Sequence, residues 1–177
     1  MYTKAQLISA AYELLYDVTP KKYDCGIICG GACCRENQSH GGESFGMLLL
    51  PGEDELLGSQ KGFCIKGSED GTLLTCDGEC ERAYRPFACR IFPFYPDVKK
   101  RAFGYSVKIL PDPRAFSVCP VVHDFRKRKT HIKFLRNAKR AVRILLRDDD
   151  IARELYSQSE MLDEIKALRE KIFKSGD

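Results

Sequence analysis

The chain has no tryptophan, only three histidines and three methionines, and no apolar run long enough to cross a membrane. A membrane-spanning helix needs about 20 mostly apolar residues, whereas the longest aliphatic run is Met47–Leu50. Residues 1–6 also lack the charged-then-apolar pattern of a secretory signal. We therefore expect a cytoplasmic protein with no membrane partner. In that compartment thiols stay reduced unless a metal or a catalytic role uses them.

Motifs of the common enzyme classes are missing as well. The sequence has no G-x-S-x-G nucleophile motif, no phosphate-binding glycine loop and no dinucleotide fingerprint. Gly26, Gly30 and Gly31 neither follow a convincing strand pattern nor open a helix. Whether the protein is an enzyme therefore stays open at this point, and no catalytic residue is assigned.

Cysteine, in contrast, is abundant. The 177 residues include nine cysteines, an odd number that argues against a closed disulfide framework. All of them lie in one span: Cys25, Cys29, Cys33, Cys34, Cys64, Cys76, Cys80, Cys89 and Cys119. Thiolates are soft ligands that suit zinc, copper(I) and iron–sulfur centres. The crowding of thiols in one span predicts a metal site.

The first four cysteines lie within residues 25–34 and are interspersed with glycines, which let a backbone turn tightly. Residues 21–44 hold few apolar side chains, so burial cannot offset the entropy lost on ordering them. Metal ligation can do so, because ligation free energy serves as folding free energy. We expect this segment to need its metal in order to fold.

A second group of cysteines consists of Cys76 and Cys80, followed by Cys89. Arg85 and Arg90 stand on either side of Cys89. A neighbouring guanidinium favours the thiolate form and can donate hydrogen bonds to sulfur. We predict that these two arginines bind or tune the metal centre. The alternative is that they make ordinary salt bridges and that Cys89 is simply buried.

Three segments together resemble the YkgJ-type cysteine-cluster family. They are the four-cysteine run, the segment Arg85-Pro86-Phe87-Ala88-Cys89-Arg90-Ile91-Phe92-Pro93, and Cys119-Pro120. That family is described as zinc- or iron-chelating, with the pattern CxxCxxCC followed by RPxxCRxFP, and flagellin lysine N-methylase is similar to it as a larger relative. The resemblance covers residues 23–122. It implies a metal-chelating domain whose main ligand pool is Cys25, Cys29, Cys33, Cys34, Cys80, Cys89 and Cys119.

The sequence departs from the family pattern at several cysteines. Each gap in the first motif is one residue longer, which leaves open whether Cys33 or Cys34 is the ligand. Cys80 fits the family's intervening cysteine better than Cys76 does, and Cys76 stays in the candidate set. Cys64 has no counterpart, and an ordinary thiol is its alternative role.

The kind of metal is left open between two classes. Three residues separate the paired cysteines in both groups, a spacing that suits zinc. The surplus of thiols favours an iron–sulfur cluster, which we prefer. His40 and His123 are further possible ligands, and solvated side chains are their alternative role.

The remaining patterns predict an α+β fold, small and irregular around the metal, with short strands and a helical C-terminal third. We expect a cysteine-cluster domain at residues 1–124 and a helical segment packed on it at 125–177. The expected elements are a helix opened by a capping box at Thr3 and Gln6, a strand at 45–50, a short helix at 51–57, a hairpin with strands at 63–66 and 72–76, a strand at 102–110, and helices at 125–147, after Asp148 and from Ser157 to Phe173.

The expected helix at 125–147 is strongly basic. Between Arg126 and Arg147 there are ten basic residues and no acidic one. Six share one helical face: Lys129, Lys133, Arg136, Arg140, Arg143 and Arg147. Apolar residues fill the opposite face and should pack on the protein: Phe134, Leu135, Ala138, Ala141, Val142, Leu145 and Leu146. The basic face is solvated, or it pairs with the acidic helix after Asp148, or it binds an acidic partner such as nucleic acid.

Taken together, these patterns predict a metal-binding protein that coordinates an iron–sulfur cluster or zinc through clustered cysteines. Two alternatives remain. One is an enzyme that modifies a protein side chain, which only the likeness to the methylase suggests. The other is a nucleic-acid-binding protein that uses the basic helix at 126–147.

Overall fold

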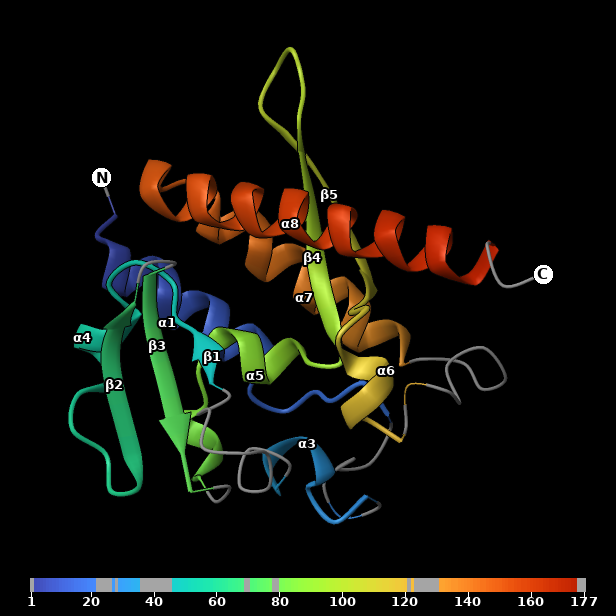
Figure 1. Cartoon of the computed structure of the whole chain (residues 1–177). Coiled ribbons are helices and arrows are strands. Elements are labelled where there is room, and N and C mark those ends of the chain that lie inside the picture. The colour runs from blue at the N-terminus through green and yellow to red at the C-terminus, as the bar shows by residue number, and fades with distance from the viewer. Residues whose placement is uncertain are drawn as a thin grey trace.

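The computed structural model describes residues 2–21, 27, 29–35, 46–68, 71–77, 80–120, 122 and 131–174. These residues form a small α+β fold with two antiparallel sheets and a helical C-terminal part, as predicted (Figure 1). The helices are α1 (Lys4–Leu15), α3 (Ala32–Arg35), α4 (Glu53–Leu57), α5 (Phe87–Ile91), α6 (Ala115–Val118), α7 (Ile132–Leu145) and α8 (Asp149–Lys174). The strands are β1 (Met47–Leu48), β2 (Phe63–Ser68), β3 (Gly71–Cys76), β4 (Phe94–Lys100) and β5 (Tyr105–Pro111).

Helix α1 begins where the sequence predicts it. The Gln6 backbone N–H donates to Thr3 Oγ1 at 3.2 Å, and the Thr3 N–H donates to Gln6 Oε1 at 2.9 Å, which is the predicted capping box. The helix buries Leu7, Ile8, Ala11 and Leu15. Its apolar face packs against α7, so the two ends of the described chain share one core.

The first sheet has the strand order β1-β3-β2. Strands β2 and β3 form the predicted hairpin, in which Phe63 lies opposite Cys76 and Cys64 lies opposite Thr75. Of the strand expected at 45–50, the described residues contain Met47 and Leu48 paired with β3. The short helix expected at 51–57 is α4.

The second sheet corrects two predictions. The strand expected at 102–110 runs instead from Tyr105 to Pro111, because Ala102 to Gly104 form the hairpin turn, in which Gly104 has a φ of 81°. Strand β4, its partner, is not among the predicted elements. Its sequence contains Pro96, and a proline inside a run of residues argues against a central strand.

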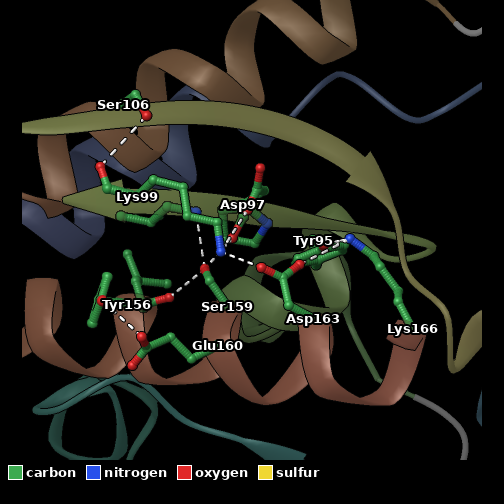
Figure 2. Close-up of polar contacts among 12 residues, drawn as sticks. Tyr95, Asp97, Lys99, Ser106, Tyr156, Ser159, Glu160, Asp163 and Lys166 are labelled. Carbon is green, nitrogen blue, oxygen red and sulfur yellow. Dashed lines mark hydrogen bonds and ion pairs between the residues drawn. The ribbon is translucent and has the colours of Figure 1, made fainter. Parts of the chain in front are cut away.

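Helix α8 is fastened to the outer edge of β4 by Ser159, which is fully buried (Figure 2). The Val98 N–H donates to Ser159 Oγ at 2.9 Å, and the hydroxyl lies 2.9 Å from the Pro96 carbonyl oxygen. An uncovered strand edge leaves backbone groups without partners. Ser159 therefore satisfies polar groups of β4 that β5 does not reach, and Pro96 has no N–H to satisfy.

Charged contacts flank this attachment (Figure 2). Lys99 of β4 pairs with Asp163 of α8, and the Lys166 ammonium lies 4.7 Å from the centre of the Tyr95 ring and contacts its hydroxyl. The side chains of Lys99, Asp163 and Lys166 are partly exposed, so the ion pair between Lys99 and Asp163 contributes roughly 0–1 kcal/mol. The cluster thus serves to hold α8 on β4.

The C-terminal helices differ from the prediction in one respect. Asp148 caps α8 as expected, since its Oδ1 accepts from the N–H groups of Asp150 at 3.0 Å and Ile151 at 3.1 Å. The predicted new helix start at Ser157 is wrong. Ser157 is an exposed residue inside one continuous helix, because neither glycine nor proline interrupts residues 149–174.

Helix α7 has the two faces that its sequence predicts. The apolar face buries Phe134, Ala138, Ala141, Val142 and Leu145, each 0% exposed, in the main hydrophobic cluster. Leu135 and Leu146 pack on that cluster half-buried. The described helix ends at Leu145, two residues before the predicted end, and residues 125–130 lie outside the described part of the chain.

Candidate metal centre

Cys29 and Cys119 lie far apart in the sequence and belong to one small hydrophobic cluster. Its buried members are Ala115, Cys119 and Val122, and Cys29 and Phe92 pack against them. Cys119 is 7% exposed, and Cys29 is half-buried. A cysteine of the first motif therefore packs against the cluster that contains the cysteine that follows the second motif.

A second contact joins the same two parts of the chain. Helix α3, which carries Cys33 and Cys34, contacts α6, and both lie in the lower part of the molecule in Figure 1. Cys119 immediately follows α6, and its N–H donates to the Ala115 carbonyl at 2.8 Å. Cys33 is half-buried. The side chain of Cys34 and all of Cys25 lie outside the described residues.

Two glycines turn the chain between Cys29 and α3. Gly30 has a φ of 61° and Gly31 a φ of 70°. This left-handed region suits glycine, because a Cβ atom there meets the following carbonyl oxygen. The tight turn expected from the glycines of the first motif is confirmed at these two positions.

The second motif forms α5, which connects the main core with the Cys29–Cys119 cluster. Phe87 and Ile91 of this helix are 2% and 3% exposed and lie in the main core. Phe92, the next residue, packs in the cluster with Cys29 and Cys119. Cys89 is half-buried on α5. The apolar residues of the motif thus fix the position of the helix that carries Cys89.

The other described cysteines lie on or just after the β2–β3 hairpin in the chain. Cys76 ends β3 and packs on a separate hydrophobic cluster with Leu74. Cys64 is exposed on β2, and Cys80 is half-buried after β3. Among the described residues, no three histidine, cysteine, aspartate or glutamate side chains form a group that holds a metal ion. His40 and His123 lie outside those residues.

Arg90 is buried, and its guanidinium binds backbone carbonyls of the segment that precedes α5. Its Nε donates to the Arg85 carbonyl and its Nη2 donates to the Ala83 carbonyl, both at 2.7 Å. The guanidinium carbon lies 3.9 Å from the centre of the Tyr12 ring. The buried Nη1 has no hydrogen-bond partner among the described residues. Arg85 takes part in this network through its backbone carbonyl.

A buried carboxylate, Glu53, lies at the start of α4 and is 0% exposed. Its oxygens accept hydrogen bonds from the Tyr12 hydroxyl, the Leu50 N–H at 2.8 Å and the Phe87 N–H at 2.5 Å. One side chain therefore links α1, α4 and α5. Sequence analysis missed Glu53, because its partners come from three distant segments and no local pattern joins them.

Burial shifts the proton affinities in this cluster. It raises the pKa of Glu53, while the hydrogen bonds from Tyr12 and the backbone act in the opposite direction. Burial, followed by the nearby charge of Glu53, raises the pKa of Tyr12 far above its ordinary value. Burial lowers the pKa of Arg90. These groups form a fixed polar junction in a mostly apolar environment.

Arg82 ties the segment before Cys89 to helix α1. Its Nη2 donates to the Val18 carbonyl at 2.9 Å, and its Nε donates to the Tyr16 carbonyl. A basic side chain at the C-terminal end of a helix satisfies carbonyl groups that have no partner inside the helix. Arg82 is thus a second residue, after Glu53, whose structural contacts the sequence patterns do not predict.

The comparisons with known proteins add no relative. No family model, curated protein or solved structure matches the chain. The likeness to the YkgJ-type family therefore stays a prediction from the motif residues. No helix of the described residues is long and apolar enough to cross a membrane.

Proposed function

We propose that this protein binds a metal centre through the cysteines of its first motif together with Cys119. The observation that carries this proposal is that Cys29 packs against the small cluster that contains Cys119, reinforced by the contact of α3 with α6. Thiols that distant segments bring together, in a chain rich in cysteine, are the donors that zinc and iron–sulfur centres require.

An iron–sulfur cluster or a zinc ion each needs four ligands of this type. Cys29 and Cys119 would supply two, and Cys25, Cys33, Cys34, Cys80 and Cys89 form the pool for the others. Because thiolates crowded together repel one another, a positive charge nearby favours the set. The Arg90 Nη1, buried next to Cys89 in the chain, is a donor that suits this task.

Serine substitutions test which thiols hold the metal. Cys119→Ser is expected to lower the metal content per chain at least about twofold, since a hydroxyl is a poor ligand for these metals. Cys29→Ser should do the same. Cys64→Ser is the matched control, because Cys64 is exposed on β2, and it should keep the wild-type metal content. The readout is elemental analysis of anaerobically purified protein, with circular dichroism to confirm folding. If Cys29→Ser and Cys119→Ser keep the same metal content as Cys64→Ser and the wild type, the assignment of Cys29 and Cys119 as ligands is contradicted.

A further inference from the structure

Four exposed cationic side chains lie on one face of helix α7, and a fifth follows two residues after the helix ends. We call Lys133, Arg136, Arg140, Arg143 and Arg147 the cationic row, and all five are exposed. The opposite face of α7 is buried in the main core. The packed face fixes the orientation of the helix, so the row is a rigid surface feature of the fold. Lys129, which the sequence pattern adds to this face, lies outside the described residues.

The row is not neutralised by the acidic C-terminal helix in the described part of the chain. The carboxylates of α8 that form ion pairs do so with other residues: Asp150 with Lys4 and Arg153, and Asp163 with Lys99 and Lys166. Figure 1 shows α8 crossing in front of β4, with α7 behind that strand. Pairing of the basic face with α8, one of the alternatives left by the sequence, thus has no ion pair to support it among these residues.

Lys133 near the start of α7, and the like charges that follow it at i,i+4, lower local helix stability, whereas Arg143 in the last turn favours it. The first turn of α7 has no acidic residue, and its N-cap, His131, makes no side-chain capping bond. Cations near a helix N-terminus oppose the helix dipole, and like charges at i,i+4 repel by a few tenths of a kcal/mol. A feature that costs stability and finds no partner inside the described fold indicates an external one.

We propose that the cationic row binds the phosphate backbone of a nucleic acid without reading its base sequence. On α7 the row runs from Lys133 to Arg143, which is about 15 Å at ~1.5 Å per residue. Phosphates recur about every 3.4 Å along each strand of a duplex, so roughly four face this part of the row. Four of the five cations are arginines, whose planar forks match phosphate oxygens. This inference does not depend on the metal site.

The exposed face favours nucleic acid over two other anionic partners. A helix that lies in a lipid interface inserts its apolar face, but Phe134, Val142 and Leu145 of α7 are buried in the protein. The core of a protein interface is depleted of charge, whereas this face of α7 carries four cations of the row and, at one end, the exposed Ile132. Asn137, also on α7, donates from its side-chain amide to the Leu14 carbonyl at 2.8 Å. This amide is therefore bonded within the protein, and a partner of this face would be held by its cations.

The test is fluorescence anisotropy of the full-length protein with a labelled, mixed-sequence DNA or RNA duplex. With about five phosphate contacts, affinity should fall about 500-fold between 50 and 200 mM salt. The double variant Arg136→Glu/Arg140→Glu should bind the duplex at least tenfold more weakly than the wild type. Its affinity should fall only about 40-fold between 50 and 200 mM salt, as expected for three phosphate contacts. The matched control, Lys61→Glu/Lys66→Glu, makes the same change in net charge at exposed lysines on and beside β2 and should bind like the wild type.

Thermal unfolding and metal content are measured on the same samples. The reversal should leave both unchanged or raise the thermal midpoint, because the row is not part of the packed face. If the reversed variant does not fold, the neutral pair Arg136→Gln/Arg140→Gln replaces it, with the same expected flattening. The proposal would be overturned by wild-type protein that binds no duplex, by binding to phosphatidylserine vesicles alone, or by equal losses of affinity in the row and control variants.

Discussion

Removal of the proposed metal under reducing conditions is expected to lower amide protection across residues 25–34 at least about a hundredfold, because in our proposal ligation free energy orders this segment. The described part of it consists of the Gly30–Gly31 turn and α3, a helix of four residues. A helix of four residues is not stable alone, because the entropy lost on forming the first turn exceeds the free energy gained from its hydrogen bond. The segment's contacts with the rest of the fold include the packing of Cys29 on the Cys119 cluster and the contact of α3 with α6.

Hydrogen exchange of the metal-loaded and metal-free protein measures this effect. The internal control is α7, whose apolar face is buried in the main core and should keep its protection. A loss restricted to the first motif and α6 supports the account. If protection of residues 25–34 is the same with and without metal, the segment is ordered by packing and the metal is not needed for its fold.

Glu53→Ala is expected to lower the free energy of unfolding by about 4 kcal/mol, since it leaves several buried donors without an acceptor. The Tyr12 hydroxyl and the N–H groups of Leu50 and Phe87 would all lose their partner. Glu55→Ala on the same helix is the matched control, because Glu55 is exposed and its removal should change stability by about 0.5 kcal/mol or less. Chemical denaturation of the three proteins provides the comparison, and equal stability of the two variants would show that Glu53 does not hold the junction together.

The difference in unfolding free energy between the wild type and Glu53→Ala should depend on pH, because the pKa of Glu53 is raised in the folded state. The folded state keeps the Glu53 proton to higher pH than the unfolded state, where the pKa is near 4.5. The stability that the carboxyl group adds is therefore fully present below that value. It declines as the pH rises through the pKa of the folded state. The gap in stability between wild type and Glu53→Ala should accordingly narrow as the pH rises above about 4.5.

Much of the fold follows from local sequence patterns. The capping box of α1, the β2–β3 hairpin and the two faces of α7 each depend on residues a few positions apart, and each is confirmed. Such elements are predictable because one short segment contains both the pattern and its cause.

The errors arise where a distant segment decides the local structure. Strand β4 exists despite Pro96 because β5 pairs one edge and Ser159 of α8 covers the other. The predicted break at Ser157 is absent because α8 needs no second cap when its apolar residues dock on β4 along one continuous helix. Neither effect has a signature within the segment itself.

In the candidate site, too, the local motifs can be predicted from the sequence, and the contacts between distant segments cannot. The cysteine motifs can be found in the sequence, but the packing of Cys29 on the Cys119 cluster depends on how α6 packs, which no local pattern encodes. The Arg90 prediction illustrates the limit. Its proximity to Cys89 is visible in the sequence, whereas its hydrogen bonds to the Arg85 and Ala83 carbonyls and its position over Tyr12 come from the fold.

The metal content of anaerobically purified protein, read together with its visible spectrum, tests the central claim most directly. We expect a stoichiometric metal: iron with acid-labile sulfide and visible absorption for a cluster, or about one zinc per chain without a visible band. The same preparation of the Cys29→Ser/Cys119→Ser variant should lose that metal. Wild-type protein that is folded, fully reduced and free of both iron and zinc would contradict the account.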